Sequence, residues 1–221
     1  MNPETPATDG LLATAGQILL GGGCIVYPTE TFFALGARAT DAAALARIVA
    51  IKARPATKPL PLLVGDMGQL AAVLPDDFMD GPLGGDFADL TDRFWPGPLS
   101  LVVPCRETLP GLIRDTLGRV SIRFTPHPTA AHLCRLAGGA LVATSANRSG
   151  LPPAAAPDDL DPLVVEAADT VVTQGPMPAG GPASTVAGLL GRRRLLIFRE
   201  GAVALGALRA AGYEVTGRQA L

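Results

Sequence analysis

The two lysines of the chain lie close together, on either side of an arginine. Lys52 and Lys58 flank Arg54, and no Asp or Glu occurs over residues 42–65. The apolar spacing places Lys52 and Arg54 in the last turn of a helix expected over residues 42–53. One interpretation is a helix end stabilised by cations, which contribute about 0.3–1 kcal/mol each. The alternative is a binding site for an anionic ligand such as a triphosphate.

Hydroxyl side chains follow two of the expected strands. Thr29-Glu30-Thr31 follows a strand over residues 24–27, and Thr144-Ser145-Ala146-Asn147 follows a strand over residues 140–144. Sheets in α/β proteins commonly bind ligands where strands end. These side chains could therefore bind phosphate oxygens or a small polar substrate, whereas ordinary capping and turn chemistry is the alternative.

Arg123 lies in a segment of alternating polarity over residues 119–124. The apolar face of this segment consists of Val120, Ile122 and Phe124. A charge on the second face of an interior strand needs a partner, because an unpaired buried charge is very costly. That partner is either an acidic residue of the chain or the carboxylate of a ligand, held by two parallel hydrogen bonds.

Standard catalytic and metal-binding motifs are absent from the sequence. There is no GxSxG, HExxH or Walker motif, and we interpret His127 and His132 as structural. Cys24, Cys105 and Cys134 lie far apart without a CxxC pair. This spacing argues against a zinc site or a disulfide framework and fits a reducing compartment.

The composition is that of a globular protein without a strong overall charge. The chain has 221 residues, 48% of them hydrophobic, and a net charge of −2, so it forms one large domain or two small ones. No global field attracts nucleic acid, and an RNA contact would need a local patch such as Arg192-Arg193-Arg194. We expect a cytoplasmic protein, because the sequence has neither a signal peptide nor an apolar run near the ~20 residues that span a bilayer.

Helical and strand patterns alternate along the chain, which predicts an α/β fold with a sheet that is at least partly parallel. Gly21-Gly22-Gly23 precedes a strand, whereas a phosphate-binding loop follows one, so we interpret this run as a helix end and tight turn. The expected helices lie before this run and at 42–53, 66–73, before Trp95, 128–137, before residue 170, and 203–211. The expected strands lie at 24–27, 60–64, 99–103, 119–124, 140–144 and 170–173, with a hairpin at 184–190 and 195–199.

Six segments together resemble the YrdC-like threonylcarbamoyl-AMP synthase family over about residues 10–201. In order, they are Pro28-Thr29-Glu30-Thr31, Lys52 to Leu60, Trp95-Pro96-Gly97-Pro98-Leu99, Ser121-Ile122-Arg123 with His127-Pro128, Thr144-Ser145-Ala146-Asn147, and Ser184-Thr185-Val186. The resemblance implies one α/β domain, in which flanking helices and a twisted, mixed open sheet surround a concave, positively charged cavity. Residues 1–9 would be an N-terminal tail, and residues 202–221 a C-terminal helix and tail.

The resemblance also implies a reaction and its site. L-threonine, bicarbonate and ATP would form threonylcarbamoyl-AMP and pyrophosphate, with Mg²⁺ bridging the phosphates. The product would supply the machinery that transfers the threonylcarbamoyl group to tRNA, and a tRNA or double-stranded RNA contact is possible. The implied catalytic residues are Lys52, Arg54, Ser145 and Asn147. The implied ATP-binding residues are Arg54, Lys58, Ser145, Asn147 and Arg199, and the implied threonine-binding residues are Thr31, Arg123, Thr144 and Ser184.

The sequence departs from the family pattern at a few positions. Phe32-Phe33-Ala34-Leu35 stands where the family usually has Val-Tyr-Gly-Leu, and Leu63 stands where some relatives have a histidine. The Pro-rich segment at 152–157 could be either a lid or a static surface loop.

Two other functions fit parts of the pattern. One is a related carbamoyl-adenylate-forming enzyme, as in hydrogenase maturation proteins, which are normally fused to Cys-rich domains. The other is a non-catalytic RNA-binding or ribosome-maturation module, which steeply salt-dependent binding without ATP dependence would reveal.

Overall fold

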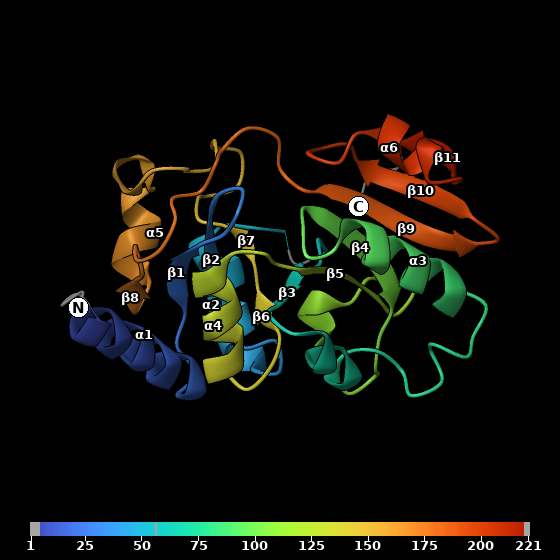
Figure 1. Cartoon of the computed structure of the whole chain (residues 1–221). Helices are drawn as coiled ribbons and strands as arrows, with labels where there is room; N and C mark the ends of the chain where they lie inside the picture. Colours follow the sequence, from blue (N-terminus) through green and yellow to red (C-terminus); the bar gives the residue numbers. More distant parts are fainter. Residues whose placement is uncertain (1–4, 56, 219–221) are drawn as a thin grey trace.

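A computed structural model describes residues 5–55 and 57–218 of the chain, in which the strands form two sheets. Figure 1 shows the smaller sheet with α1 and α5 at one end of the molecule, and β9 to β11 with α6 at the other. The small sheet has the order β7-β2-β1-β8, and its strands are β1 (Ile25–Pro28), β2 (Phe33–Gly36), β7 (Thr144–Ser145) and β8 (Thr170–Val171).

The large sheet has the order β11-β10-β9-β4-β5-β3-β6 and mixes parallel with antiparallel pairs. Its strands are β3 (Leu62–Val64), β4 (Leu99–Pro104), β5 (Arg119–Phe124), β6 (Leu141–Val142), β9 (Thr185–Gly191), β10 (Arg194–Arg199) and β11 (Glu214–Arg218). The prediction of an α/β fold with mixed, open sheets is confirmed. The expected single sheet was wrong, because the strands divide between two.

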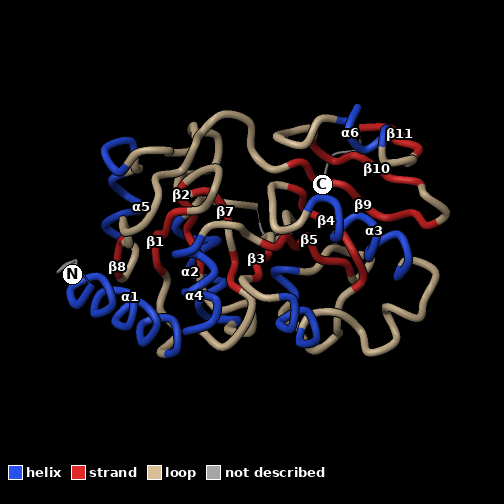
Figure 2. The backbone as a smooth tube through the Cα atoms, viewed as in Figure 1, coloured by secondary structure: helices blue, strands red, loops and turns tan. Residues whose placement is uncertain are grey.

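Helices flank both sheets, as Figure 2 shows by colour. The α-helices are α1 (Thr5–Leu20), α2 (Ala42–Ile51), α3 (Gly84–Phe94), α4 (Pro128–Leu136), α5 (Pro162–Ala167) and α6 (Leu205–Ala210). Three short 3₁₀-helices are η1 (Met67–Ala72), η2 (Gly111–Ile113) and η3 (Pro157–Asp159). No helix in the described part of the chain is both long and apolar enough to cross a membrane.

Strand β1 is buried on both faces because its side chains alternate between two helical layers. Ile25 and Tyr27 pack in the cluster that contains residues of α1 and α4, whereas Val26 packs in the larger core with residues of α2 and α5. A strand covered on both sides is a continuous apolar run, which is why its position could be predicted. Its end therefore has a fixed position from which the following turn projects.

The two sheets are joined through one extended segment. The strand expected over residues 140–144 is two strands, since β6 pairs in the large sheet and β7 in the small sheet, with Ala143 between them. Where β2 passes β6, a Cβ on Gly36 would lie 2.1 Å from the carbonyl oxygen of Val142, so only glycine fits. The hydroxyl of Tyr27 donates to the same oxygen at 2.8 Å and ties the sheets together.

Several expected elements differ from the observed ones. Strand β2 was not predicted, because its Phe-Ala-Leu-Gly sequence has no period-2 pattern. Strand β11 was also missed; it pairs in parallel with β10, so the expected C-terminal tail is partly the edge of the large sheet. The segment expected as a helix at 66–73 is the 3₁₀-helix η1, capped by Asp66. Residues 5–9 belong to α1 rather than to a tail, and residues 1–4 lie outside the described residues.

Candidate functional site

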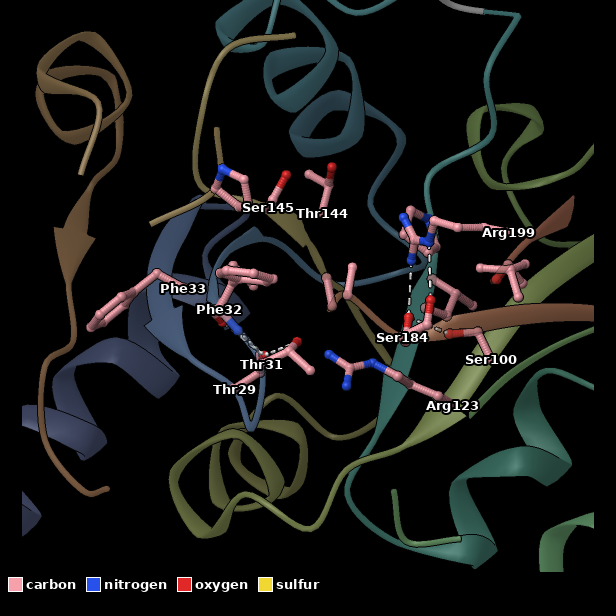
Figure 3. A pocket seen from close by; sticks show the side chains of 18 of the residues that line it. Thr29, Thr31, Phe32, Phe33, Ser100, Arg123, Thr144, Ser145, Ser184 and Arg199 are labelled. Carbon is pink, nitrogen blue, oxygen red and sulfur yellow. Dashed lines mark hydrogen bonds between the residues drawn. The ribbon is translucent and has the colours of Figure 1, made fainter. Parts of the chain in front are cut away.

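A cavity of about 400 Å³ is lined by residues of both sheets. Thr29 and Thr31 reach it from the β1–β2 turn, Thr144 and Ser145 from β7, and Arg123 from β5 (Figure 3). The remaining lining residues are Phe32, Phe33, Ala34, Arg54, Pro59, Pro61, Leu62, Ser100, Ser121, Ala143, Asn147, Leu151, Pro153, Ala183, Ser184, Val186 and Arg199. Segments far apart in the sequence thus meet where the two sheets adjoin.

Eight of the ten residues predicted for the site line this cavity, and two do not. The eight are Thr31, Arg54, Arg123, Thr144, Ser145, Asn147, Ser184 and Arg199. Lys52 is buried beside the cavity without lining it, and Lys58 is exposed.

The turn that carries Thr29 and Thr31 is a tight hairpin between β1 and β2. Pro28 pairs with Phe33 across the two strands. The hydroxyl of Thr29 donates to the carbonyl oxygen of Phe32 at 2.7 Å and closes the turn. Thr29 therefore uses its hydroxyl proton inside the turn, and the Thr31 hydroxyl, 3.5 Å from that of Thr29, has only this long contact among the described residues.

Lys52 holds the segment after β7 in place. It is only 2% exposed and forms the C-cap of α2. Its ammonium donates to the carbonyl oxygens of Ser145 and Asn147, and the amide of Ser149 donates to the Lys52 carbonyl at 2.9 Å. Burial, together with the nearby charge of Arg54, lowers the pKa of Lys52 to about 8. Its ammonium therefore faces main-chain carbonyls, not the cavity.

Arg54 lies beyond the end of α2 rather than in its last turn. Ala53 has a positive φ of 47°, and the amide of Arg54 donates to the Val49 carbonyl at 3.0 Å, which is the Schellman pattern of a helix end. The guanidinium donates to the carbonyls of Lys58 at 3.1 Å and Pro59 at 2.9 Å. Burial lowers the pKa of Arg54. The loop thereby directs this cation to the cavity.

Arg123 is paired with an acidic residue of the chain. This was one of the two expected partners, the other being the carboxylate of a ligand. The side chain is buried and forms an ion pair with Glu30. The second carboxylate oxygen of Glu30 accepts a hydrogen bond from the Thr125 hydroxyl at 2.8 Å. Burial lowers the pKa of Arg123 to about 10, so it remains charged at neutral pH. Glu30 was not among the predicted site residues, although it lies between Thr29 and Thr31.

Ser184 and Arg199 form a hydrogen-bonded group with Ser100, a residue that sequence reasoning missed. Arg199 donates to the carbonyl and the hydroxyl of Ser184, and the hydroxyls of Ser184 and Ser100 are 3.1 Å apart. Ser100 is buried in β4 between Leu99 and Leu101. Its only sequence signal was a hydroxyl inside an otherwise apolar strand.

The described residues that line the cavity include three arginines and no Asp, Glu, His or Cys. The ionisable side chains of the described lining are thus arginines, which can pair with an anionic ligand. Asn147 adds an acceptor, because its Oδ1 is buried without a hydrogen-bond partner among the described residues, while its amide nitrogen donates to the Arg148 and Leu151 carbonyls.

The departures from the family pattern lie at or near this cavity. Phe33 is fully buried and Ala34 pairs with Ser145, and both contribute to the lining. Leu63 is buried in the cluster against α4 and does not line the cavity. Pro153 borders the cavity in the Pro-rich segment, whose Ala154 carbonyl accepts a hydrogen bond from the Phe33 amide at 2.9 Å.

The arginine triplet of the β9–β10 turn is partly used within the fold. Arg193 donates to Asp89 at 3.3 Å and stacks on Tyr213 with its guanidinium carbon 4.8 Å from the ring centre. All three arginines are exposed, and the guanidinium of Arg193 is used within the fold.

Comparison with known proteins identifies the family. A sequence model named for Sua5, YciO and YrdC, and described as "Telomere recombination", matches residues 17–201. The chain belongs to this family. Similar members include threonylcarbamoyl-AMP synthases of Nitrosococcus oceani, 41% identical over 63% of this chain and 72% of the relative, and of Chromobacterium violaceum, 39% identical over 67% and 73%.

Solved structures of the family have the same fold. P. abyssi Sua5, whose structure was determined in complex with L-threonine, is 29% identical with a TM-score of 0.80. The match covers 93% of this chain but 58% of Sua5, so the chain spans about three fifths of that protein. E. coli YciO shares the fold with a TM-score of 0.72 at 22% identity, over 89% of this chain and 91% of YciO.

Proposed function

We propose that the protein makes threonylcarbamoyl-AMP and pyrophosphate from L-threonine, bicarbonate and ATP. The observation that carries this proposal is the convergence of Arg54, Arg123 and Arg199 on one cavity that has no acidic lining residue among those described. The membership of the chain in a family that includes threonylcarbamoyl-AMP synthases supports it. The product would then serve the machinery that modifies tRNA.

The chemistry needs no protein nucleophile. The amine of threonine bonds to the carbon of CO₂ derived from bicarbonate and releases a proton, which leaves an N-carboxylate. One oxygen of this carboxylate attacks the α-phosphorus of ATP, while the bond between the α-phosphorus and the bridging oxygen breaks and pyrophosphate leaves. An ionised carboxylate is already a nucleophile, so the lining needs cations and hydroxyls for positioning rather than a general base.

Each lining group then has a specific role. Arg54, which is half-buried, and Arg199, which is exposed, offset the negative charge of the phosphates. Ser145 and Asn147 contact the nucleotide, and the free Oδ1 of Asn147 is suited to a ligand hydroxyl or amine.

The amino acid would bind at the other predicted residues. The guanidinium of Arg123 binds the carboxylate of threonine, as charge-assisted pairs of this kind are strong. Thr31, Thr144 and Ser184 bind its hydroxyl or amine.

The two lysines act indirectly in this scheme. Lys52 is a positioning residue that fixes the carbonyls of Ser145 and Asn147. Lys58 has an exposed side chain, and its carbonyl accepts from Arg54. We therefore propose that Lys58 contributes to ATP binding mainly by orienting Arg54.

The residues of the cavity do not form a protein-held Mg²⁺ site. Within the described ranges, no group of three His, Cys, Asp or Glu side chains is suited to a metal ion, and Mg²⁺ prefers oxygen ligands such as carboxylates. We therefore expect Mg²⁺ to be bound by the phosphate oxygens of ATP and by water, and we assign no step to it.

The test is an assay of pyrophosphate release from ATP. Release should require both L-threonine and bicarbonate, and a threonylcarbamoyl adenylate should be found as the product. Carbamoyl phosphate in parallel reactions tests the related carbamoyl-adenylate activity. Release that is independent of threonine, or supported only by carbamoyl phosphate, would contradict the proposal.

A further inference from the structure

Glu30 has a buried contact that the proposed chemistry does not explain. It lies in the β1–β2 turn between two lining residues, Thr29 and Thr31, but does not itself line the cavity. We infer that Glu30 is a positioning residue, which orients the guanidinium of Arg123 so that it binds the carboxylate of the amino-acid substrate. This inference rests on the proposed function.

Both carboxylate oxygens of Glu30 are used within the fold. Oε1 pairs with Nη1 of Arg123, and Oε2 accepts from the Thr125 hydroxyl at 2.8 Å. The Thr125 hydroxyl in turn accepts from the His127 amide at 3.1 Å, so its proton is directed at Glu30. The Glu30 side chain is 15% exposed and that of Arg123 8% exposed, which limits screening by water.

The main chain around Glu30 is held as well. The amide of Ala179 donates to the Glu30 carbonyl at 3.2 Å, and the amide of Gly180 donates to the Thr31 carbonyl at 2.9 Å. The connection between β8 and β9 therefore holds the main chain of the β1–β2 turn in place. A rigid turn gives the carboxylate a fixed position, which an orienting role requires.

The ion pair joins the two halves of the cavity. Glu30 follows β1 of the small sheet, and Arg123 belongs to β5 of the large sheet. Figure 3 shows the guanidinium of Arg123 projecting toward the turn that carries Thr31, without a hydrogen bond to the other lining residues drawn. Because a guanidinium has five N–H donors in a planar fork, donors remain for a ligand carboxylate after one nitrogen pairs with Glu30.

Electrostatics also requires a partner for Arg123 before the substrate binds. Burial, and then the nearby positive charge of Arg199, disfavour the charged form of Arg123 and lower its pKa. An unpaired buried cation would be costly, and Glu30 provides the compensating charge. Removal of this charge should therefore weaken binding of the amino acid and leave the nucleotide contacts largely unchanged.

The test is Glu30→Gln, which retains the shape and an acceptor for Thr125 but removes the charge. We expect the KM for L-threonine to rise about 10-fold or more, since directly coupled groups interact at this level. The KM for ATP should change less than about 3-fold, because distant contacts contribute independently. The matched control is Glu107→Gln, which changes an exposed glutamate and should leave both values unaltered.

A double-mutant cycle separates orientation of Arg123 from a general structural role. In an Arg123→Ala background, Glu30→Gln should add less than about 2-fold to the KM for threonine, because its target is gone. Thr125→Val, which keeps the charge but removes the hydrogen bond, should raise the KM for threonine by a smaller factor and provides a second test if Glu30→Gln does not fold. Equal rises in both KM values, or full additivity with Arg123→Ala, would overturn the inference.

Calorimetric titration with L-threonine distinguishes failure of this inference from failure of the proposed function. A wild type that binds threonine but releases no pyrophosphate contradicts only the proposed function, and weaker binding by Glu30→Gln would still support the positioning role. An active wild type with unchanged threonine binding in Glu30→Gln contradicts only the positioning role. A wild type that binds no threonine overturns both.

Discussion

Arg199 contacts Ser184 through two hydrogen bonds, from Nε to the carbonyl oxygen at 3.0 Å and from Nη2 to the hydroxyl at 3.1 Å. The arginine ends β10, and the serine immediately precedes β9. The guanidinium of Arg199, which is proposed to bind phosphate, thus also holds the Ser184 hydroxyl, which is proposed to bind threonine. A change at Arg199 should therefore also move the Ser184 hydroxyl.

Substitution of Arg199 should consequently affect both substrates. In Arg199→Ala, we expect the KM values for ATP and for L-threonine each to rise about 10-fold or more, because hydrogen bonds to charged groups contribute about 1.5–3 kcal/mol. Steady-state kinetics with each substrate varied in turn measures this effect. Arg194→Ala, at an exposed position of the same strand, is the control. A change confined to ATP would show that Arg199 does not orient Ser184 for threonine.

Removal of the Lys52 amine should destabilise the protein as well as inactivate it. In Lys52→Met, the Asn147 carbonyl loses its donor, at about 1–3 kcal/mol, and the Ser145 carbonyl keeps only the Asn147 amide. The cost of burying a charge is also removed. We expect the free energy of unfolding to fall by about 1–4 kcal/mol, measured by urea denaturation, and pyrophosphate release to fall at least about 10²-fold.

Lys58→Met is the control for this variant, since exposed substitutions usually change stability by less than about 0.5 kcal/mol. Full stability of Lys52→Met together with loss of activity would mean that Lys52 acts on the ligand directly rather than on the segment after β7.

Arg54 and Lys58 should differ sharply in their effect on ATP. Arg54 lines the cavity, whereas the side chain of Lys58 is exposed. Arg54→Ala should lower pyrophosphate release at least about 10²-fold, since preorganised charge contacts often contribute that much. Lys58→Ala retains the carbonyl that binds Arg54 and should lower release less than about 10-fold. Near-normal turnover in Arg54→Ala would contradict the proposed role of Arg54 in offsetting the charge of the phosphates.

His127 should make stability depend on pH in the acidic range. Its Nε2 donates to the Pro176 carbonyl at 2.8 Å, and its Nδ1 caps α4 as an acceptor. Burial lowers the pKa of His127 below the ordinary 6.5. As the pH falls below about 6.5, the unfolded chain binds the proton more readily than the folded one, so the free energy of unfolding decreases.

The comparison variant for this prediction is His127→Asn, which does not titrate. Urea denaturation from pH 5 to 8 should give a steeper loss of stability at low pH for the wild type than for the variant. Parallel curves for the two proteins would show that His127 is not responsible for the loss.

Much of the fold could be predicted because several elements have strong local signals. The apolar run of β1, the alternation of β5 and the Asp41 cap of α2 each depend on residues that are neighbours in sequence. Strands β2 and β11 lack such a signal, since their structure comes from pairing with β1 and β10. The split of residues 140–144 between two sheets likewise depends on partners distant in sequence.

Residue types and motif order by themselves predicted a set of site residues, and most of these residues line one cavity. The tertiary structure alone decided how they are used: Lys52 faces carbonyls rather than the cavity, and Arg123 is paired with Glu30. The physical reason is that a buried charge needs a compensating polar or charged group close to it in space. In this chain that group lies 93 residues away for each cation, at Ser145 and at Glu30.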